Sequence, residues 1–223
     1  MNYRPMLIAN GVLIASMAGL SAWAWNQIPD GAQIPVHWNL EGHIDRFASK
    51  SEALVFFPAL TLLITAMMWT LPRFDPRRAN LEASGKFWNA ATILLGLFLA
   101  YLHVLITLGA LGQSVDMANA LIPGLCVLIA GLGNYLGKTR SNWFGGVRTP
   151  WTLSSEYAWE KTHRVTGRLF VLSGLVTMIA WFVLGAKLSL FVLIGSLIAS
   201  VTAAVALSYF YWRIDPARRL ESH

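Results

Sequence analysis

Long apolar stretches dominate this chain and recur six times, separated by polar connections. Each stretch approaches the roughly 20 residues that an α-helix needs to cross about 30 Å of hydrocarbon. The pattern therefore predicts an all-α fold, a polytopic transmembrane helical bundle of six spans. The predicted spans are residues 6–25, 53–71, 88–111, 120–136, 165–184 and 188–211.

The polar connections differ in length, and two are long enough to carry specificity: residues 26–52 and residues 137–164. The short connections at 112–117 and 186–187 predict tight turns between antiparallel helices. Residues 72–86 form a basic connection whose two prolines stop the second helix. We divide the chain into a two-span region, residues 1–86, and a four-span region, residues 87–223.

Composition and charge place the chain in a membrane. It is 56% hydrophobic and 13% charged, about half the charge of an average soluble domain, which excludes a water-soluble fold. Positive charge stays on the cytoplasmic side during insertion, and an inside N-terminus puts 14 of the 17 Lys and Arg residues on that side. We therefore predict a multi-pass membrane protein with both termini on the cytoplasmic side. The basic excess is an insertion and lipid-headgroup signal and does not call for a nucleic-acid partner.

The first apolar stretch predicts a retained helix. Trp23 and Trp25 stand where a signal-peptide cleavage site prefers small residues. The single cysteine, Cys126, falls inside the fourth span, so no intramolecular disulfide is possible.

The outer connection holds the polar motif IPVHWNLEGHIDRFASK, residues 34–50. Its candidate binding residues are His37, Trp38, Asn39, Asp45 and Lys50. A second interpretation is a metal site, because imidazole and carboxylate groups are zinc ligands. That site would use His37, His43 and Asp45 with His103 from the third span. The spacing is not one that a common zinc site requires, so we favour a hydrogen-bonded recognition loop and predict no bound metal or cofactor.

Polar residues inside the spans are few. His103 is a candidate for proton transfer, since ionisable groups within a bilayer are costly and often functional. The alternative is a neutral imidazole bonded to a backbone carbonyl or to a hydroxyl on a neighbouring helix. Asn10, Asn89 and Asn134 predict hydrogen bonds between helices.

The inner connection reads GKTRSNWFGGVRTPWTLSSEYAWEKTHR, residues 137–164. Pro150 forces extended backbone at Thr149, and we expect a helix to begin at Ser154 or Ser155. Glu156, Glu160 and His163 then share one helical face. This face could bind a metal, but we favour ion pairs with nearby basic residues, namely Arg148, Lys161, Arg164 and Arg168.

The candidate binding residues of the inner connection carry hydroxyl, indole, amide and charged groups. They are Asn142, Arg148, Thr149, Trp151, Thr152, Glu156, Trp159 and His163. The chain holds no HExxH helix, GxSxG elbow or Walker loop. We therefore expect a protein that is not an enzyme.

Both long connections resemble known sequence patterns. Residues 34–50 resemble the I-P-x-H-W-N-x-x-G-x-x-D-x-x-x-x-K pattern of an uncharacterised bacterial membrane domain. The segment from Gly133 to Arg168 resembles the signature of the SdpI family, in which R-T-P-W-T-L is followed by W-x-x-T-H. The positions that match are Pro35, His37, Trp38, Asn39, Gly42, Asp45 and Lys50, together with Asn134, Asn142, Gly146, Arg148, Thr149, Pro150, Trp151, Thr152, Trp159, Thr162 and His163.

The resemblance implies a non-enzymatic immunity or signal-receiving protein of the plasma membrane. The expected partners are the lipid bilayer, a secreted membrane-active toxin peptide at the outer face and a cytoplasmic repressor or regulator. Two other classes stay open. A small transporter would be marked by an internal repeat, and a membrane metalloenzyme would use the outer-loop histidines.

Overall fold

The computed structural model describes residues 1–39 and 42–221, with the side chains of residues 219–221 outside this description. Helices make up most of the described chain, and a small β-hairpin lies between the first two long helices. In order, the elements are α1 (Arg4–Trp25), β1 (Ile34–Trp38), β2 (Ile44–Ala48), α2 (Lys50–Thr70), the 3-10 turn η1 (Leu71–Arg73), α3 (Arg78–Ala83), α4 (Gly85–Ala110), α5 (Met117–Leu136), α6 (Pro150–Ser154), α7 (Glu156–Arg213) and α8 (Pro216–Glu221).

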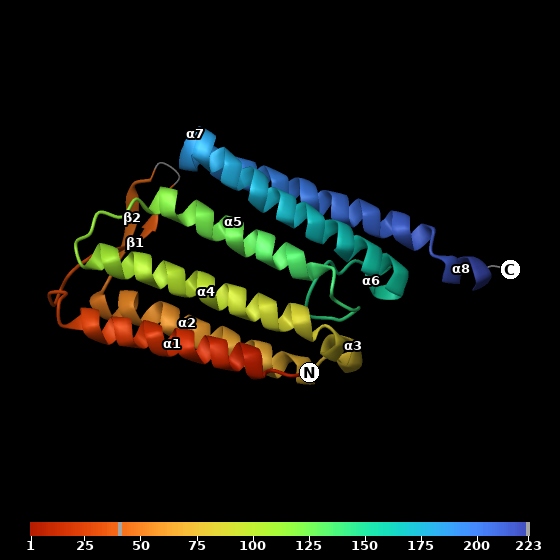
Figure 1. Ribbon diagram of the computed structural model, residues 1–223, viewed down its shortest axis with the longest axis horizontal. Coiled ribbons are helices and arrows are strands. Elements are labelled where there is room, and N and C mark those ends of the chain that lie inside the picture. Colours follow the sequence, from red (N-terminus) through yellow and green to blue (C-terminus); the bar gives the residue numbers. More distant parts are fainter. Residues whose placement is uncertain (40–41, 222–223) are drawn as a thin grey trace.

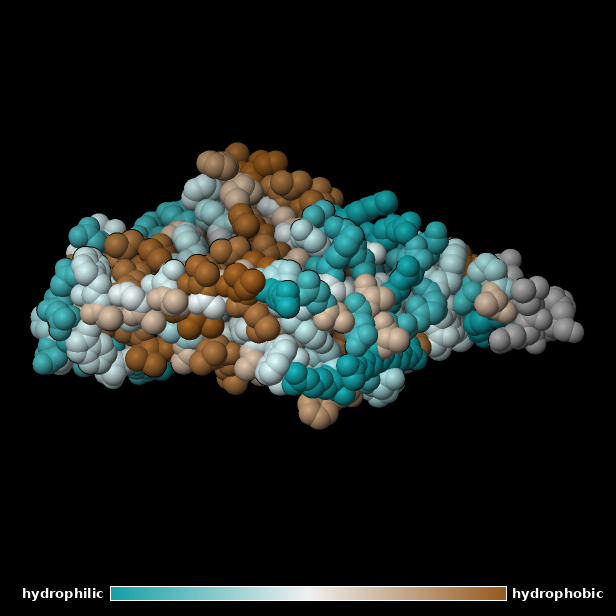
Figure 2. All heavy atoms as spheres, turned by 60° about the horizontal axis from the view of Figure 1, so that its bottom comes forward, coloured by the Kyte–Doolittle hydropathy of each residue, from teal (hydrophilic) through white to brown (hydrophobic). Residues whose placement is uncertain are grey.

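The long helices run side by side along the length of the molecule. Figure 1 shows α1 and α2 on one side, then α4, then α5, and α7 on the opposite side. The β-hairpin lies at one end, while the N-terminus, α3, α6 and α8 lie at the other. Hydrophobic side chains gather between two hydrophilic ends on the face shown in Figure 2, as a bundle that crosses a bilayer requires. The prediction of an all-α polytopic helical bundle is confirmed.

Five helices of the described chain are long and apolar enough to cross a membrane: α1, α2 with η1, α4, α5 and α7. The last of these folds back on itself. Gly185 adopts φ 78° and ψ 175°, a backbone conformation open to glycine, and reverses the direction of α7. The two arms are antiparallel, since the hydroxyl oxygens of Ser173 and Ser200 lie 3.3 Å apart. The fifth and sixth predicted spans are therefore the two arms of one hairpin, and the number of membrane crossings stays a prediction.

Capping residues set where the helices begin. The side chains of Ser49, Asp116 and Ser155 accept backbone N–H bonds at the first turns of α2, α5 and α7. Each cap satisfies a donor that has no partner inside its helix. The expected start of α7 near Ser154 or Ser155 is correct, because Ser155 is the N-cap.

Helices α1, α2 and α4 are joined by a buried amide. Asn10 is fully buried, and its Nδ2 donates to the hydroxyl of Thr65 on α2 at 2.8 Å and to the carbonyl of Thr92 on α4 at 3.3 Å. The interhelical role predicted for Asn10 is confirmed. Asn89 instead bonds the carbonyls of Asn2 and Gly85.

Helix α5 packs closely on the first arm of α7. A Cβ on Gly133 would lie 2.6 Å from the carbonyl oxygen of Gly167, and a Cβ on Gly167 would lie 2.5 Å from that of Gly133. Only glycine allows the two backbones to approach so closely, a common feature of helix pairs in membranes. Asn134, next to this contact, is exposed and makes no hydrogen bond within the described residues, so its predicted interhelical role is wrong.

The outer connection is more ordered than the sequence predicted. Residues 34–38 pair with residues 44–48 as an antiparallel two-stranded sheet, where we expected only a loop. Ile34 and Ala48 are buried against α2 and α4 in a cluster that includes Leu54 and Ile106. The hairpin is thus anchored to the bundle by apolar packing.

Candidate functional site

A hollow of about 680 Å³ opens where the β-hairpin meets the ends of the helices that we predict to face outward. Its walls come from β1, α2, α4, the start of α5 and the turn of α7, which converge at one end of the molecule in Figure 1. The deeper lining is apolar and includes Phe57, Leu102, Ile106, Ile122 and Leu190. We call this hollow the outer pocket.

Three of the predicted outer residues, His37, Trp38 and Asn39, line the outer pocket. Trp38 is half-buried and packs on the apolar cluster beneath the hairpin. It also lines a smaller hollow of about 150 Å³. Trp38 therefore has a structural role as well as a place in the outer pocket.

The other two predicted outer residues support the loop. The Oδ1 atom of Asp45 lies 2.6 Å from Nδ1 of His37, and this contact orients the imidazole. The Lys50 ammonium lies 2.9 Å from Asp30 and 4.8 Å from the centre of the Trp25 ring. With 11% of its side chain exposed, Lys50 ties the loop to the end of α1.

Polar groups from two other connections complete the rim of the outer pocket. These are Asp116 and Asn119 from the start of α5 and Lys187 from the turn of α7. Hydrogen bonds from the backbone and side chain of Asn119 lower the pKa of Asp116 below its ordinary value, so its carboxylate is ionised at neutral pH. The sequence alone did not identify these residues as part of a site. The N-cap pattern of Asp116 was visible, but nothing in it showed that the residue faces the hairpin.

The residues of the alternative metal site do not converge. Within residues 1–39 and 42–221, no group of three or more His, Cys, Asp or Glu side chains could hold a metal ion. His37 bonds Asp45, while His43 is exposed in the hairpin turn. His103 is fully buried, and its Nε2 lies 3.1 Å from the Ser21 hydroxyl and 3.2 Å from the Met17 carbonyl of α1. This geometry matches the alternative in which His103 bonds a backbone carbonyl or a hydroxyl on a neighbouring helix.

The inner connection is folded around a stacked pair of rings. Trp159 is fully buried and donates from Nε1 to the carbonyl of Thr139 at 3.1 Å. The His163 ring stacks on it, with centroids 4.0 Å apart and an angle of 20°. Nε2 of His163 accepts the backbone N–H of Val147 at 2.8 Å, and Nδ1 lies 2.8 Å from the carbonyl of Trp159. A backbone N–H can only donate and a carbonyl can only accept, so His163 is a neutral imidazole with its proton on Nδ1.

Asn142 shapes the turn that precedes this contact. Its Oδ1 accepts from the backbone N–H groups of Phe144 and Gly145, and its Nδ2 donates to the carbonyl of Arg140. The side chain is 1% exposed. Such side-chain bonds replace the backbone pairing that a turn lacks, and they make Asn142 a structural residue.

The RTPWTL segment docks on the second arm of α7. Thr149 and Thr152 form a capping box at the start of α6, and the Thr149 hydroxyl donates to that of Ser208 at 3.0 Å. Trp151 packs on Tyr209 with ring centroids 5.1 Å apart. The segment thus connects both arms of the α7 hairpin to the inner loop.

Glu156, Glu160 and His163 lie on one side of α7, as their spacing predicted, but among the described residues they do not form the alternative metal site. His163 is buried under the loop, whereas Glu156 is exposed and accepts from Asn80 at 3.2 Å. Glu160 pairs with Arg164 and lies 3.9 Å from Arg140. The ion-pair interpretation therefore holds for Glu160.

Arg148 has a different partner from the carboxylate that we expected. Its guanidinium donates to the carbonyl of Trp143, and no ion pair of Arg148 occurs in the described part of the chain. Both side chains are exposed, Trp143 by 46%. They form a small cation and indole surface at the inner end.

A buried carboxylate joins the inner loop to the preceding connection. Asp75 accepts the backbone N–H of Arg77 at 2.6 Å and that of Trp143 at 3.0 Å. The Arg77 guanidinium donates to the Ser141 hydroxyl and to the carbonyl of Leu153. Residues 72–78 therefore hold the inner loop in place through these hydrogen bonds. From the sequence alone they were only a basic connection.

Comparison with known proteins supports the resemblance carried by the two motifs. Residues 138–211 match the model of the SdpI/YfhL protein family, and residues 12–62 match a domain of unknown function, DUF1648. The chain is 24% identical over 188 residues to the immunity protein SdpI of Bacillus subtilis (strain 168), an alignment that covers 83% of this chain and 87% of that protein. No solved structure matches the chain. Neither family match covers residues 63–137, so the proposed boundary at residue 86 stays a prediction.

Proposed function

We propose that this chain, a multi-pass membrane protein of the SdpI family, is an immunity protein that binds a membrane-active peptide in its outer pocket. Similarity to an immunity protein over most of both chains supports the general function. The observation that carries the binding site is the outer pocket of about 680 Å³, which combines an apolar interior with a polar rim.

The chemistry of the outer pocket suits an amphipathic peptide. Ligand sites are mainly apolar hollows with a few placed polar groups, and Phe57, Leu102 and Ile122 supply the apolar lining. The rim offers an imidazole held by Asp45, the carboxylate of Asp116 and the ammonium of Lys187. An apolar side chain of the peptide would fill the pocket while its polar backbone or terminus bonds the rim.

Binding alone would give protection without an enzymatic step. A peptide held at the outer pocket is withheld from the lipid it would otherwise perturb. We therefore propose a non-enzymatic mechanism that needs no cofactor. The exposed surface of Arg148 and Trp143 at the opposite end is the proposed contact for a cytoplasmic regulator.

Chemical cross-linking tests the peptide site. A photoreactive benzoylphenylalanine would replace Ala118, an exposed residue lining the outer pocket. Ser114, exposed in the preceding connection and not part of the pocket lining, provides the matched control position. The host is a Bacillus subtilis strain that lacks its immunity protein SdpI and is challenged with a secreted membrane-active peptide to which that loss makes it sensitive.

Illumination should link a secreted peptide to position 118 and not to position 114. Equal linkage at both positions, or none at 118 in cells that the chain protects, would contradict the proposed site. If the chain gives no protection at all, the immunity function itself is refuted.

Side-specific labelling tests which end faces outward. Cysteines introduced at Gln33 and Ser154, both exposed, would be compared in a Cys126→Ala background. An impermeant thiol reagent added to intact cells should label position 33 only. Ser154 is exposed and therefore open to the reagent, unlike Ser141 in the same connection, which is buried. Labelling of position 154 and not 33 would reverse the orientation.

A further inference from the structure

A second hollow, of about 380 Å³, lies at the inner ends of α5 and α7 and is separate from the outer pocket. It exists because Gly133 and Gly167 bring the two helices into backbone contact, which leaves no side chains to fill the groove beside them. Gly137 extends the groove, since a Cβ there would lie 3.3 Å from the Cα of Arg164. We call this hollow the inner cleft.

The charge of the inner cleft has one sign. Lys138, Arg164 and Arg168 line it, and none of the described residues that line it is acidic. Arg164 is paired with Glu160 outside the cleft. The Lys138 ammonium lies 4.2 Å from the centre of the Tyr135 ring, and neither it nor Arg168 forms an ion pair within the described residues. Two exposed cations are therefore left to face an anion.

The inner cleft also offers a neutral donor and an apolar wall. The exposed amide of Asn134 lines it from α5, and Val171 lines it from α7. Arg168 and Val171 fall in the first turns of the predicted fifth span, where the headgroup region gives way to hydrocarbon. Cations with apolar stems at this depth reach toward lipid phosphates.

From this arrangement we propose that the inner cleft binds the phosphodiester headgroup of an anionic phospholipid, with Lys138 and Arg168 as its cationic ligands. The guanidinium of Arg168 can hold two phosphate oxygens at once, while Lys138 contributes a point charge. Basic pockets between helices on the cytoplasmic side are suited to acidic headgroups. The lipid would occupy the groove between the helices and stabilise the α5–α7 pair.

Native mass spectrometry of the purified full chain tests the proposal. The chain in uncharged detergent would be titrated with phosphatidylglycerol and, separately, with phosphatidylcholine of the same acyl chains. The wild-type chain should retain phosphatidylglycerol more strongly. The Lys138→Gln, Arg168→Gln double variant should bind phosphatidylglycerol about 25-fold more weakly, from about fivefold for each cation near a membrane surface.

Two controls separate this site from general charge attraction. The Arg4→Gln, Lys86→Gln double variant removes two exposed cations from the same end of the molecule, on α1 and α4, and should change phosphatidylglycerol retention less than twofold. A large excess of inorganic phosphate should fail to displace the lipid. If the unfolding midpoint of the cleft double variant falls, the single Arg168→Gln variant, with an expected loss of about fivefold, carries the test.

Three outcomes would overturn the proposal. Equal retention of the two lipids by the wild-type chain would remove the preference for an anionic headgroup. An equal loss of phosphatidylglycerol binding in the cleft and control variants would mean that the binding depends only on the overall charge of the protein. Displacement by inorganic phosphate would assign the inner cleft to a free anion in place of a lipid.

Discussion

Replacing Gly146 with alanine places a methyl group against the ring on which the inner loop is built. Gly146 adopts φ 113°, and a Cβ there would overlap Nε2 of His163 and lie 2.9 Å from its Cδ2. Backbone strain at such a residue costs about 1–3 kcal/mol. Displacing the imidazole also breaks its bond with the Val147 N–H, which costs about 1–3 kcal/mol when a buried donor is left unsatisfied. We expect Gly146→Ala to lower the free energy of unfolding by about 3 kcal/mol.

Denaturant titration of the purified protein in micelles measures this effect. Gly109→Ala and Gly195→Ala are the matched controls, since both residues are helical and a Cβ at either has no atom within 4 Å. Each should stabilise the protein by up to about 1 kcal/mol. A double-mutant cycle with His163→Ala isolates the clash, because only backbone strain should remain in that background. The reasoning fails if Gly146→Ala costs less than about 1 kcal/mol, or if its cost is unchanged without the imidazole.

Three other changes test the packing of the described chain by the same unfolding measurement. Asp75→Asn should cost about 1–3 kcal/mol, because Asp75 accepts two backbone N–H groups and an amide offers only one oxygen to them. An unchanged free energy of unfolding would show that Asp75 does not hold the inner loop in place. Asn10→Ala should cost about 1 kcal/mol, the scale of an interhelical hydrogen bond in a membrane, and no loss would deny its role in joining α1, α2 and α4. Trp38→Ala should cost about 2 kcal/mol, roughly half the value for a fully buried tryptophan, because Trp38 is half-buried against the apolar cluster beneath the hairpin. Trp38→Phe should keep most of this free energy of unfolding. Equal losses in the two variants would mean that Trp38 does not stabilise the protein by packing.

The helical bundle could be predicted because its signals are local. Apolar length determines each span, and capping residues such as Ser155 mark where helices begin. The interhelical hydrogen bonds of Asn10 could also be predicted, since a polar side chain inside a span needs a partner on a neighbouring helix. Asn134 shows the limit of that rule: it lies at a span end, where water and headgroups can satisfy it.

The surroundings of the inner residues could not be predicted from helical spacing. Glu156, Glu160 and His163 do lie on adjoining positions of α7, but residues 139–147 fold over His163, while Glu156 is exposed and Glu160 is half-buried. Spacing fixes the direction of a side chain and not which part of a distant loop covers it. The β-hairpin was missed for a related reason, because its pairing depends on packing against α2 and α4.

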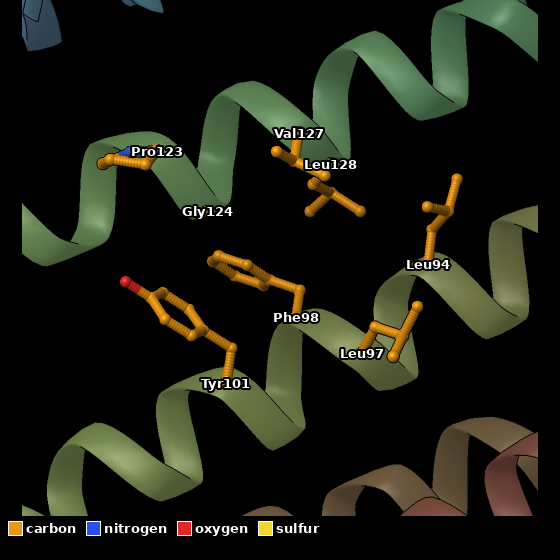
Figure 3. A pocket seen from close by; sticks show the side chains of 8 residues that line it. All are labelled: Leu94, Leu97, Phe98, Tyr101, Pro123, Gly124, Val127 and Leu128. Carbon is orange, nitrogen blue, oxygen red and sulfur yellow. The ribbon is translucent and has the colours of Figure 1, made fainter.

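The outer pocket was only half visible in the sequence. The motif pointed to His37, Trp38 and Asn39, all of which line the pocket. Asp116 and Lys187 come from connections that are far away in the chain, and they join the pocket only because the helices are antiparallel. The apolar groove in Figure 3, between Leu94 to Tyr101 of α4 and Pro123 to Leu128 of α5, is similarly a product of packing.

Survival of challenged cells tests the central claim that the outer pocket is the peptide site. Bacillus subtilis lacking the immunity protein SdpI would express the wild-type chain, Ala118→Trp or Ser114→Trp, and would be challenged with a secreted membrane-active peptide to which the loss of SdpI makes it sensitive. Ala118→Trp places an indole in the outer pocket from an exposed position, whereas Ser114→Trp adds the same ring outside it. At matched membrane levels, the wild-type chain and Ser114→Trp should protect, and Ala118→Trp should lose protection. Full protection by Ala118→Trp would contradict the claim that the peptide binds in the outer pocket.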